Sequence, residues 1–216
     1  MKKGKLIVIE GTNSSGKETQ SNLLVAKLKK EGIPAIKMRF PDYESPTGKI
    51  IGECILGKHS ESFFKEGINE IPPKVAALYY AADRAYNIDK INKLLETGTN
   101  IILDRYVESN MAYQAAKFDD LKDRINMLLW MEQLEFNLLD LPRPDKVICL
   151  YLPYEYRTDQ CDDNKHLKNT ESVYGLLAER YNFAIINCIK DDKIRDRNEI
   201  SEEIYHIIKE FLSAEC

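Results

Sequence analysis

The sequence predicts an α/β fold in which helices cover both faces of one parallel sheet. Three observations predict it. Short apolar segments recur along the chain, long helical patterns separate them, and most of the segments are apolar at nearly every position rather than at every second one. Strands buried on both faces show such continuous runs, and parallel strands need helix-sized connections between them. We therefore expect a central parallel sheet with helices on both sides.

Five segments are the expected strands. Four of them are clearly apolar or β-branched, whereas the second in chain order is more mixed. They span residues 6–9, 35–40, 101–103, 147–152 and 184–188.

Helical patterns fill the gaps between these strands. Pro72 and Pro73 open one that runs to about Leu95, and Gly98 ends it. Another covers residues 120–139, and the last, over residues 200–212, repeats apolar residues at steps of three and four. Ser45 and Pro46 are most simply a further helix start, with Pro in the first turn.

Size and charge limit the possible functions. The 216 residues predict one domain, residues 1–216, since a single core commonly serves a chain of this length. With 31 Lys and Arg against 35 Asp and Glu, the net charge is −4. Such a chain has no global attraction to nucleic acid or to an anionic membrane, so we expect neither as a partner. Any polyanion must be held by a few local basic groups.

The cysteines and the N-terminus predict a cytoplasmic protein. The five cysteines are odd in number, far apart and without a C-x-x-C pair, which is typical of free thiols in a reducing compartment. The short apolar stretch of residues 6–9 is too brief for a signal peptide or a membrane span. The cysteines are Cys54, Cys149, Cys161, Cys188 and Cys216.

The strongest chemical signal follows the first expected strand. Residues 11–17 read Gly-Thr-Asn-Ser-Ser-Gly-Lys, which matches the phosphate-binding loop up to its lysine. Backbone N–H groups of such a loop point at phosphate oxygens, the following helix adds its positive dipole end, and the lysine reaches the outer phosphates. This places the chain among P-loop NTP hydrolase-like folds. The candidate ATP-binding residues are Gly11, Asn13, Ser14, Ser15, Gly16, Lys17, Glu18 and Thr19.

One position departs from the loop pattern. Where the motif has Ser or Thr to hold Mg²⁺, this chain has Glu18. A carboxylate can bind a hard cation, although it adds negative charge close to a triphosphate. We hypothesise that Glu18 binds Mg²⁺ directly or orients a water on it.

A second anionic site is expected beside the loop. Asp104 and Arg105 end the third strand, and ligands of open parallel sheets collect at the carboxyl ends of strands. Arginine suits a fork-like grip on a phosphoryl group. A phosphate loop alone fits a kinase, a hydrolase or a switch, and a second phosphate site favours a kinase.

Several segments together resemble the thymidylate kinases, of the nucleoside monophosphate kinase class, over nearly the whole chain. The resemblance implies transfer of the γ-phosphoryl group of ATP to thymidine 5′-monophosphate (dTMP), with Mg²⁺ as cofactor, in a homodimer. The matching segments are residues 9–17, Phe40-Pro41-Asp42-Tyr43, 45–48, Ala81-Ala82-Asp83-Arg84, Asp104-Arg105-Tyr106, Ala112-Tyr113-Gln114 and 141–145.

The resemblance implies roles for the charged residues. Lys17 would hold the ATP phosphates, Arg105 would clamp the acceptor phosphate, and Asp104 would help to organise Mg²⁺ and water. Arg84 would hydrogen-bond the base. Asn13 stands where the family usually has an acidic residue that contacts the acceptor.

It also implies an acceptor pocket. Tyr80 would stack on thymine and Tyr113 would lie under the sugar, where it would crowd out a 2′-hydroxyl. The other expected pocket residues are Phe40, Tyr43, Ser109 and Asn110. Simpler interpretations stay open: Tyr80 and Tyr113 as ordinary core aromatics, and Arg84 as a solvated surface charge.

A lid completes the expected site. Phosphoryl transfer often recruits an arginine from a mobile segment, and the phosphate loop here has none. We define the lid as residues 153–168, which carry Arg157 and, behind it, Lys165 and Lys168. We hypothesise that Arg157 closes over the transferring group. The alternative is a solvated connection with incidental charges.

Two further functions remain possible from the sequence. The chain could phosphorylate another nucleoside monophosphate or a deoxynucleoside, or it could be a weakened nucleotide-binding regulator. The 120–139 helix also carries more apolar surface than one buried stripe needs, which favours a homodimer.

Overall fold

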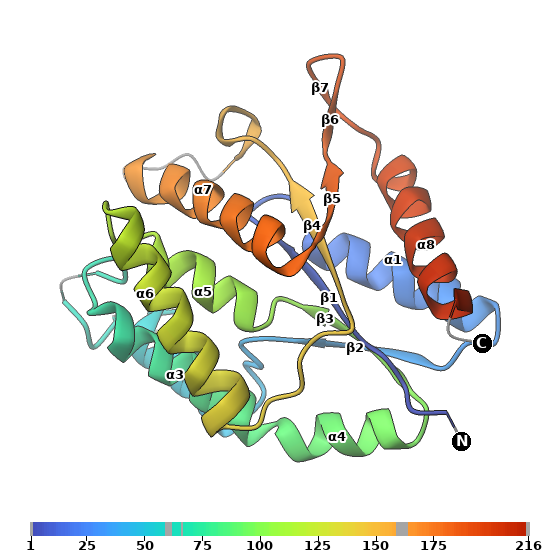
Figure 1. The fold of residues 1–216 in the computed structure, drawn as a ribbon, viewed down its shortest axis with the longest axis horizontal. Helices are drawn as coiled ribbons and strands as arrows, with labels where there is room; N and C mark the ends of the chain where they lie inside the picture. The colour runs from blue at the N-terminus through green and yellow to red at the C-terminus, as the bar shows by residue number, and fades with distance from the viewer. Residues whose placement is uncertain (1, 59–61, 66, 159–163, 215–216) are drawn as a thin grey trace.

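The computed structural model describes residues 2–58, 62–65, 67–158 and 164–214. A five-stranded sheet crosses its centre in the order β2-β3-β1-β4-β5, and every neighbouring pair of strands is parallel (Figure 1). The predicted α/β fold with one parallel five-stranded sheet is confirmed. The strands are β1 (Leu6–Gly11), β2 (Ala35–Arg39), β3 (Asn100–Asp104), β4 (Lys146–Tyr151) and β5 (Ala184–Asn187).

The central strands explain the continuous apolar runs. In β1, Leu6 and Val8 face one core and Ile7 and Ile9 face the other, and all four are fully buried. Each such side chain contributes about 1.5–3 kcal/mol by leaving water. A strand with a core on each side therefore has no solvent face on which polar residues would alternate.

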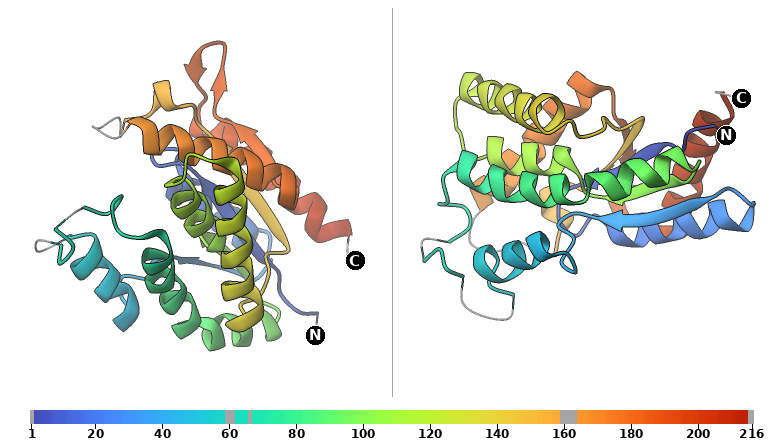
Figure 2. Two further views of the ribbon diagram at one scale, coloured as in Figure 1. Left: turned by 60° about the vertical axis from the view of Figure 1, so that its left-hand side comes forward. Right: turned by 90° about the horizontal axis from the view of Figure 1, so that it is seen from below.

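Helices form a layer on each face of the sheet (Figure 2). On one side lie α1 (Lys17–Lys30) and α8 (Arg197–Ala214), which share a core with the sheet. In the described chain, the other side carries α3 (Pro73–Tyr86), α4 (Ile88–Glu96), α5 (Val107–Ala115), α6 (Leu121–Glu132) and α7 (Asn164–Tyr181).

The short helix α2 (Pro46–Ile50) confirms the predicted helix start. Ser45 is its N-cap, and the Ser45 hydroxyl accepts a hydrogen bond from the Gly48 N–H at 2.9 Å. A π-helix, η1 (Ile51–Ile55), continues from it.

The prediction of one helix from residue 72 to 95 is wrong in one respect. Asn87, with φ −96° and ψ 0°, separates α3 from α4. The Asn87 side chain donates to the Asp83 carbonyl at 2.9 Å, the kind of side-chain bond to the backbone that disfavours a helix interior. The predicted end at Gly98, where φ is 82°, is confirmed.

The predicted helix over 120–139 is also divided. It is α-helical to Glu132 and continues as a π-helix, η2 (Gln133–Leu138). Such turns carry an extra residue and often lie at functional sites. This one shifts the side chains after Glu132 relative to a regular helix.

The chain after β4 also departs from prediction. A 3₁₀ turn, η3 (Tyr154–Tyr156), follows β4, and α7 already begins at Asn164, so residues 164–168 of the predicted lid are helical. Residues 159–163 lie outside the described residues.

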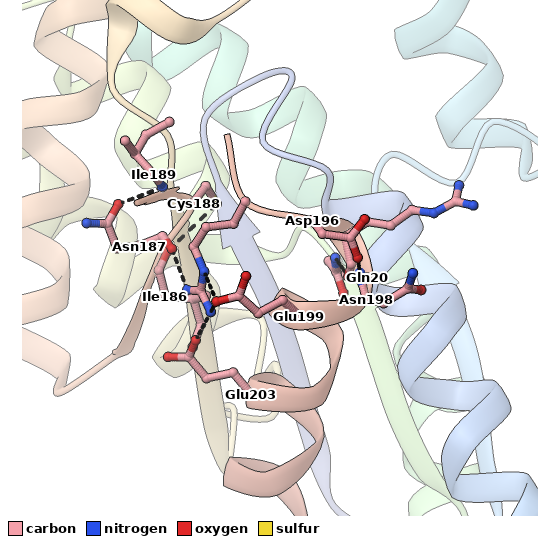
Figure 3. A network of polar contacts seen from close by, with 11 residues as sticks. Gln20, Ile186, Asn187, Cys188, Ile189, Asp196, Asn198, Glu199 and Glu203 are labelled. Carbon is pink, nitrogen blue, oxygen red and sulfur yellow. Dashed lines mark hydrogen bonds and ion pairs between the residues drawn. The ribbon is translucent and has the colours of Figure 1, made fainter. Parts of the chain in front are cut away.

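A small hairpin that the sequence did not predict follows β5. It consists of β6 (Ile189–Lys190) and β7 (Lys193–Ile194). Arg195, just after it, donates to the Asn187 carbonyl at 2.7 Å and pairs with Glu199 and Glu203. Figure 3 shows Glu199 and Glu203 turned toward the end of β5. These contacts fix the hairpin to α8.

The predicted free thiols are confirmed for Cys54, Cys149 and Cys188, whereas Cys161 and Cys216 fall outside the described residues. Within the described ranges, none of the helices has the length and apolar character that crossing a membrane requires.

Candidate active site

The phosphate loop lies between β1 and α1, as predicted. Its two glycines have positive φ angles, 138° at Gly11 and 88° at Gly16. At Gly11 a Cβ atom would lie 2.5 Å from the Leu150 carbonyl oxygen of the neighbouring strand. Gly16 is the N-cap of α1, so the free N–H groups of the first helical turn face the loop.

Lys17 is held inside this loop. The Lys17 ammonium donates to the Thr12 carbonyl at 2.5 Å, and the residue is 6% exposed. Burial, and then the nearby charge of Arg105, lowers its pKa to about 7, against the opposing effect of Glu10 and Asp104. The lysine therefore lies within electrostatic reach of the residues that end β1 and β3.

Glu18 and Thr19 lie on the exposed side of the first turn of α1. The Glu18 carboxylate is 3.5 Å from the Lys37 ammonium of β2, and its side chain is 64% exposed. The carboxylate that we hypothesised as a magnesium ligand is therefore already paired with the Lys37 ammonium.

Arg105 forms the predicted second cationic group. Its φ of 69° turns the chain at the end of β3, and its N–H donates to the Ile9 carbonyl at 3.2 Å. The Arg105 guanidinium donates to Asn13 Oδ1 at 2.6 Å and to Ser109 Oγ at 3.1 Å. Its partners are thus neutral oxygens, one of them on the phosphate loop. Burial opposes its charge, but Tyr113, Tyr174 and nearby carboxylates raise its pKa above the ordinary value.

Asn13 therefore joins the two predicted sites. Its Oδ1 also accepts from the Tyr113 hydroxyl at 2.9 Å. We assigned Asn13 to ATP binding, and the structure turns its side chain to the two residues predicted to hold the acceptor. Tyr113 is half-buried and packs against the main core, and its hydroxyl also belongs to this network, so its place under the acceptor sugar stays a prediction.

Glu10 organises this region, although the sequence analysis gave it no role. It is fully buried and accepts from the N–H groups of Tyr106 and Ser109 and from the hydroxyls of Ser109 and Tyr174, at 2.7–3.0 Å. The bonds to both N–H groups lie at the start of α5, where a helix binds anions. Glu10 thus fixes the helix that carries Ser109 and Tyr113.

Asp104 is the other carboxylate at this edge. It ends β3, lies opposite Ile9 of β1 in the sheet register and is 4% exposed. Its charge acts on Lys17, which places it beside the phosphate loop as predicted.

Arg84 is a buried member of an ion pair. The residue is 2% exposed, so the alternative of a solvated surface charge is wrong. Its Nε donates to Glu135 Oε2 at 2.6 Å, and its Nη2 donates to Glu135 Oε1. Asn110 Nδ2 donates to the same Oε1 atom at 3.0 Å. The sequence analysis missed Glu135, which belongs to the π-helix η2.

Two acceptor atoms on α5, one of them on the residue that binds Glu135, have no partner in the described part of the chain. Among the described residues, Asn110 Oδ1 and Gln114 Oε1 are buried without a hydrogen bond. The two residues stand one helical turn apart on α5, and Asn110 also donates to the Ala77 carbonyl of α3 at 3.1 Å. Buried acceptors in this state call for a donor from a ligand or water. Gln114 was quoted in the sequence analysis only as part of a motif.

The predicted aromatic residues lie around these groups. Tyr80 is half-buried, and burial together with neighbouring Tyr43 raises its pKa. Tyr43 is also half-buried, and the Lys58 ammonium lies 3.3 Å from its ring centroid. Phe40 differs, because it is 3% exposed and packs on Tyr106 with ring centroids 5.9 Å apart. Its place as pocket lining stays a prediction.

Asp83, next to Arg84, fixes the segment that carries Tyr43. It is fully buried and accepts from the Asp42 N–H at 2.8 Å, from Ser45 Oγ at 2.7 Å and from Thr47 Oγ1 at 2.8 Å. The start of α2 is thereby attached to α3.

Arg157 lies close to the phosphate loop, but its guanidinium is already bound to other groups of the protein. Its side chain is buried, its Nε donates to the Leu152 carbonyl at 3.1 Å, and its Nη2 pairs with Glu171 of α7. The interpretation of Arg157 as an incidental solvated charge is therefore wrong. The next residue, Thr158, donates to Ser14 Oγ at 2.9 Å, so the lid touches the tip of the phosphate loop.

Comparison with known proteins identifies the family. A family model described as thymidylate kinase matches residues 9–186, which run from β1 to β5 and include Lys17, Arg84 and Arg105. The chain belongs to the thymidylate kinase family.

Individual thymidylate kinases resemble it over nearly the whole of this chain. The thymidylate kinase of Plasmodium falciparum is 31% identical over 212 residues, covering 95% of this chain and 92% of the relative. That of Schizosaccharomyces pombe is 36% identical over 209 residues, covering 97% and 79%. The solved structure of the Candida albicans thymidylate kinase has a TM-score of 0.72 at 26% identity and covers 96% of this chain and 92% of its own.

Proposed function

We propose that the phosphate loop holds ATP and the Arg105–Arg84 region holds dTMP, so that this member of the thymidylate kinase family transfers the γ-phosphoryl group of ATP to dTMP. An oxygen of the dTMP phosphate forms a bond to the γ-phosphorus, the bond to the β–γ bridging oxygen breaks, and dTDP and ADP result. The observation that carries this assignment is the Arg105–Asn13 bond at 2.6 Å, which joins a phosphate-binding cation to the loop.

The acceptor orientation follows from the chemistry of thymine. Its ring edge offers one donor, N3–H, between two carbonyl oxygens. The unpartnered oxygens of Asn110 and Gln114 match that donor, and the Arg84 guanidinium can donate to a carbonyl. With the phosphate at Arg105, Tyr80 would stack on the base and Tyr113 would lie under the sugar, as the family resemblance implies.

Mg²⁺ fits this site with ligands from the nucleotide. In the described part of the chain, no cluster of three His, Cys, Asp or Glu side chains could hold a metal ion. Mg²⁺ on nucleotides commonly takes one or two carboxylates and completes its shell with phosphate oxygens and water. Asp104 suits this role better than Glu18, which faces Lys37. Bound Mg²⁺ would neutralise charge on the transferring phosphates.

Arg157 supplies the lid charge in this proposal. It would have to leave Glu171 to reach the transferring group, and its buried Nη1 has no partner to lose. We expect Arg157→Ala to lower turnover about a hundredfold or more, with a smaller change in the KM for dTMP. Wild-type turnover in that variant would contradict the role and direct attention to Lys165 and Lys168.

An acceptor panel tests the proposed function. ADP release from MgATP is measured without acceptor and with dTMP, deoxyuridine, uridine and cytidine monophosphates. We expect release to require an acceptor and dTMP to give the highest kcat/KM. A higher kcat/KM with another monophosphate would establish the alternative acceptor, and release independent of all of them would establish a nucleotide hydrolase or regulator. No structural observation favours either alternative.

We also infer a homodimer formed through α3 and α6. Large apolar side chains on both helices are exposed, and the Lys74 ammonium of α3 lies 5.1 Å from the Trp130 ring of α6, which brings the two helices together. The exposed residues are Val75, Leu78, Tyr79, Tyr86, Leu121, Ile125 and Leu129. Sedimentation should give twice the chain mass of 25.0 kDa, and a 25.0 kDa particle would contradict the dimer.

Two further expectations belong to the proposal. The whole chain would act as one domain with its lid within residues 153–168, and it would work in the cytoplasm. The free thiols of Cys54, Cys149 and Cys188 support a reducing compartment.

A further inference from the structure

The two arginines of the acceptor site differ in the charge of their partners. Arg84 is bound by both oxygens of Glu135, and both side chains are almost completely buried. Arg105 instead donates to an amide oxygen and a hydroxyl, on Asn13 and Ser109. One guanidinium is thus paired directly with a carboxylate. The other has neutral hydrogen-bond partners, and the Glu10 and Asp104 carboxylates act on it without forming an ion pair with it.

The carboxylate that neutralises Arg84 lies in an unusual backbone segment. Glu135 belongs to the π-helix η2, in which Leu139 N–H donates to the Leu134 carbonyl five residues earlier at 3.0 Å. The Leu141 N–H donates to the carbonyl of Glu135 itself at 3.0 Å. Asn110 adds a third donor to the carboxylate. Glu135 is therefore held in position by its backbone as well as by its side chain.

A site with two arginines offers two positions at which a phosphate could bind, and the Arg84–Glu135 pair makes these positions different. A fork-shaped guanidinium binds phosphate well, and a buried guanidinium without a counter-charge attracts any anion that reaches it. An acceptor phosphate could then bind at either arginine, and only one of these orientations presents it to ATP.

We propose that Glu135 fixes the orientation of the acceptor: by cancelling the charge of Arg84, it makes that end of the site a hydrogen-bond donor for the base and leaves Arg105 as the site for the phosphate. Glu135 is a positioning and specificity residue, since it acts through Arg84. The inference rests on the proposed function and adds to it the reason why the phosphate avoids Arg84.

A purely structural buried pair would behave differently. It would attach η2 to α3, and its loss would weaken every ligand or unfold the protein. If Glu135 instead cancels the charge of Arg84, its loss should change the binding of two probes in opposite directions. Thymidine, which carries only the sugar and base, should bind less well, while a small anion should bind better. Only the proposed role moves the two probes in opposite directions.

The test uses Glu135→Gln, which removes the charge and keeps the size. At saturating ATP, so that the phosphate loop is filled, thymidine and inorganic phosphate are each measured as competitors of dTMP. We expect the inhibition constant of thymidine to rise about tenfold and that of phosphate to fall at least threefold. Weakening of both probes, or no change in either, would overturn the inference.

A matched control is Glu132→Gln, one turn earlier on α6. Glu132 also accepts hydrogen bonds and pairs with arginines, Arg143 and Arg180, but at the partly exposed outer side of the helix. Its substitution should leave both inhibition constants within twofold of the wild type. Opposite shifts in this control as well would contradict a role specific to Glu135.

A second variant keeps the test usable if Glu135→Gln folds poorly. The double variant Arg84→Gln/Glu135→Gln removes both charges, so phosphate should bind as weakly as in the wild type while thymidine stays weak. Tight phosphate binding in the double variant would overturn the inference. A wild-type protein without dTMP-dependent ADP release would refute the proposed function itself, whereas a dTMP-active wild type with unaltered variants would refute only this inference.

Discussion

Asn13 of the phosphate loop accepts a hydrogen bond from Arg105 at the end of β3, with 2.6 Å between Nη2 and Oδ1. The bond connects two segments that are 92 residues apart in the chain. Because the amide is neutral, it orients the guanidinium without cancelling its charge. The position of the acceptor-binding arginine thus depends on the loop that binds ATP.

Asn13→Ala should therefore lower the catalytic efficiency with the acceptor dTMP more than it weakens the binding of ATP. Arg105 and Tyr113 would both lose an acceptor, and a hydrogen bond to a charged group contributes about 1.5–3 kcal/mol. We expect kcat/KM for dTMP to fall about 10- to 100-fold and the KM for ATP to change less than threefold. Steady-state kinetics measure both. Ser14→Ala, in the same loop, serves as the control. If Asn13→Ala impaired the kinetic constants for dTMP and for ATP equally, the link between the loop and the acceptor site would be contradicted.

Lys17 should take up a proton when the nucleotide binds. Its pKa of about 7 leaves it mostly neutral at pH 8, and the phosphates would raise that pKa and restore the charge. Calorimetry of ATP binding at pH 8 in buffers of different ionisation enthalpy should show uptake of up to about one proton. Lys17→Met should abolish the uptake. Binding enthalpies that do not depend on the buffer in the wild type would contradict it.

Glu108 should make stability depend on pH. Burial first, and then the charge of Glu10, raises its pKa to about 8, and its Oε2 has no partner. The folded protein keeps a proton that the unfolded chain releases above its ordinary pKa, so the free energy of unfolding falls as pH rises from about 4.5 to 8.

Replacing the carboxyl with an amide removes this cost. Relative to the wild type, Glu108→Gln should gain on the order of 1–3 kcal/mol in unfolding free energy between pH 5 and pH 8. Urea unfolding at the two pH values measures the difference. A constant gap between variant and wild type would show that Glu108 titrates normally.

Asp83→Asn should destabilise the fold without touching the phosphate loop. The amide keeps one acceptor atom for the three donors that now converge on the carboxylate, from Asp42, Ser45 and Thr47. We expect a loss of about 1–3 kcal/mol in unfolding free energy. Asp89→Asn, an exposed carboxylate in the first turn of α4, should change it by less than about 0.5 kcal/mol. Similar losses in both variants would contradict the assignment.

The strands and the phosphate loop could be predicted because their signals are local. Leu6 to Ile9 are apolar in sequence and buried in the fold, and the glycines at positions 11 and 16 have the positive φ angles that such a loop requires. The helix breaks were harder, since Asn87 and the residues of η2 both fit a continuous helical pattern. At Asn87 the break goes with a local bond from its side chain to the Asp83 carbonyl, whereas Glu135 of η2 binds Arg84, 51 residues away.

The acidic residues that organise the site could not be assigned from the sequence. Glu135 stands in an amphipathic pattern like any surface glutamate, and its partner Arg84 is 51 residues away. Glu10 reaches Ser109 across 99 residues. Only the packing of α3, α5 and η2 around the sheet shows that these carboxylates are buried and which groups they hold.

Transfer of label from γ-³²P-ATP tests the central claim most directly. The wild-type protein is incubated with labelled MgATP and dTMP, and the products are separated. We predict that the label appears in dTDP, in an amount equal to the ADP formed, and that Arg105→Ala lowers this transfer at least a hundredfold. Label released as inorganic phosphate, with none in dTDP, would contradict the account.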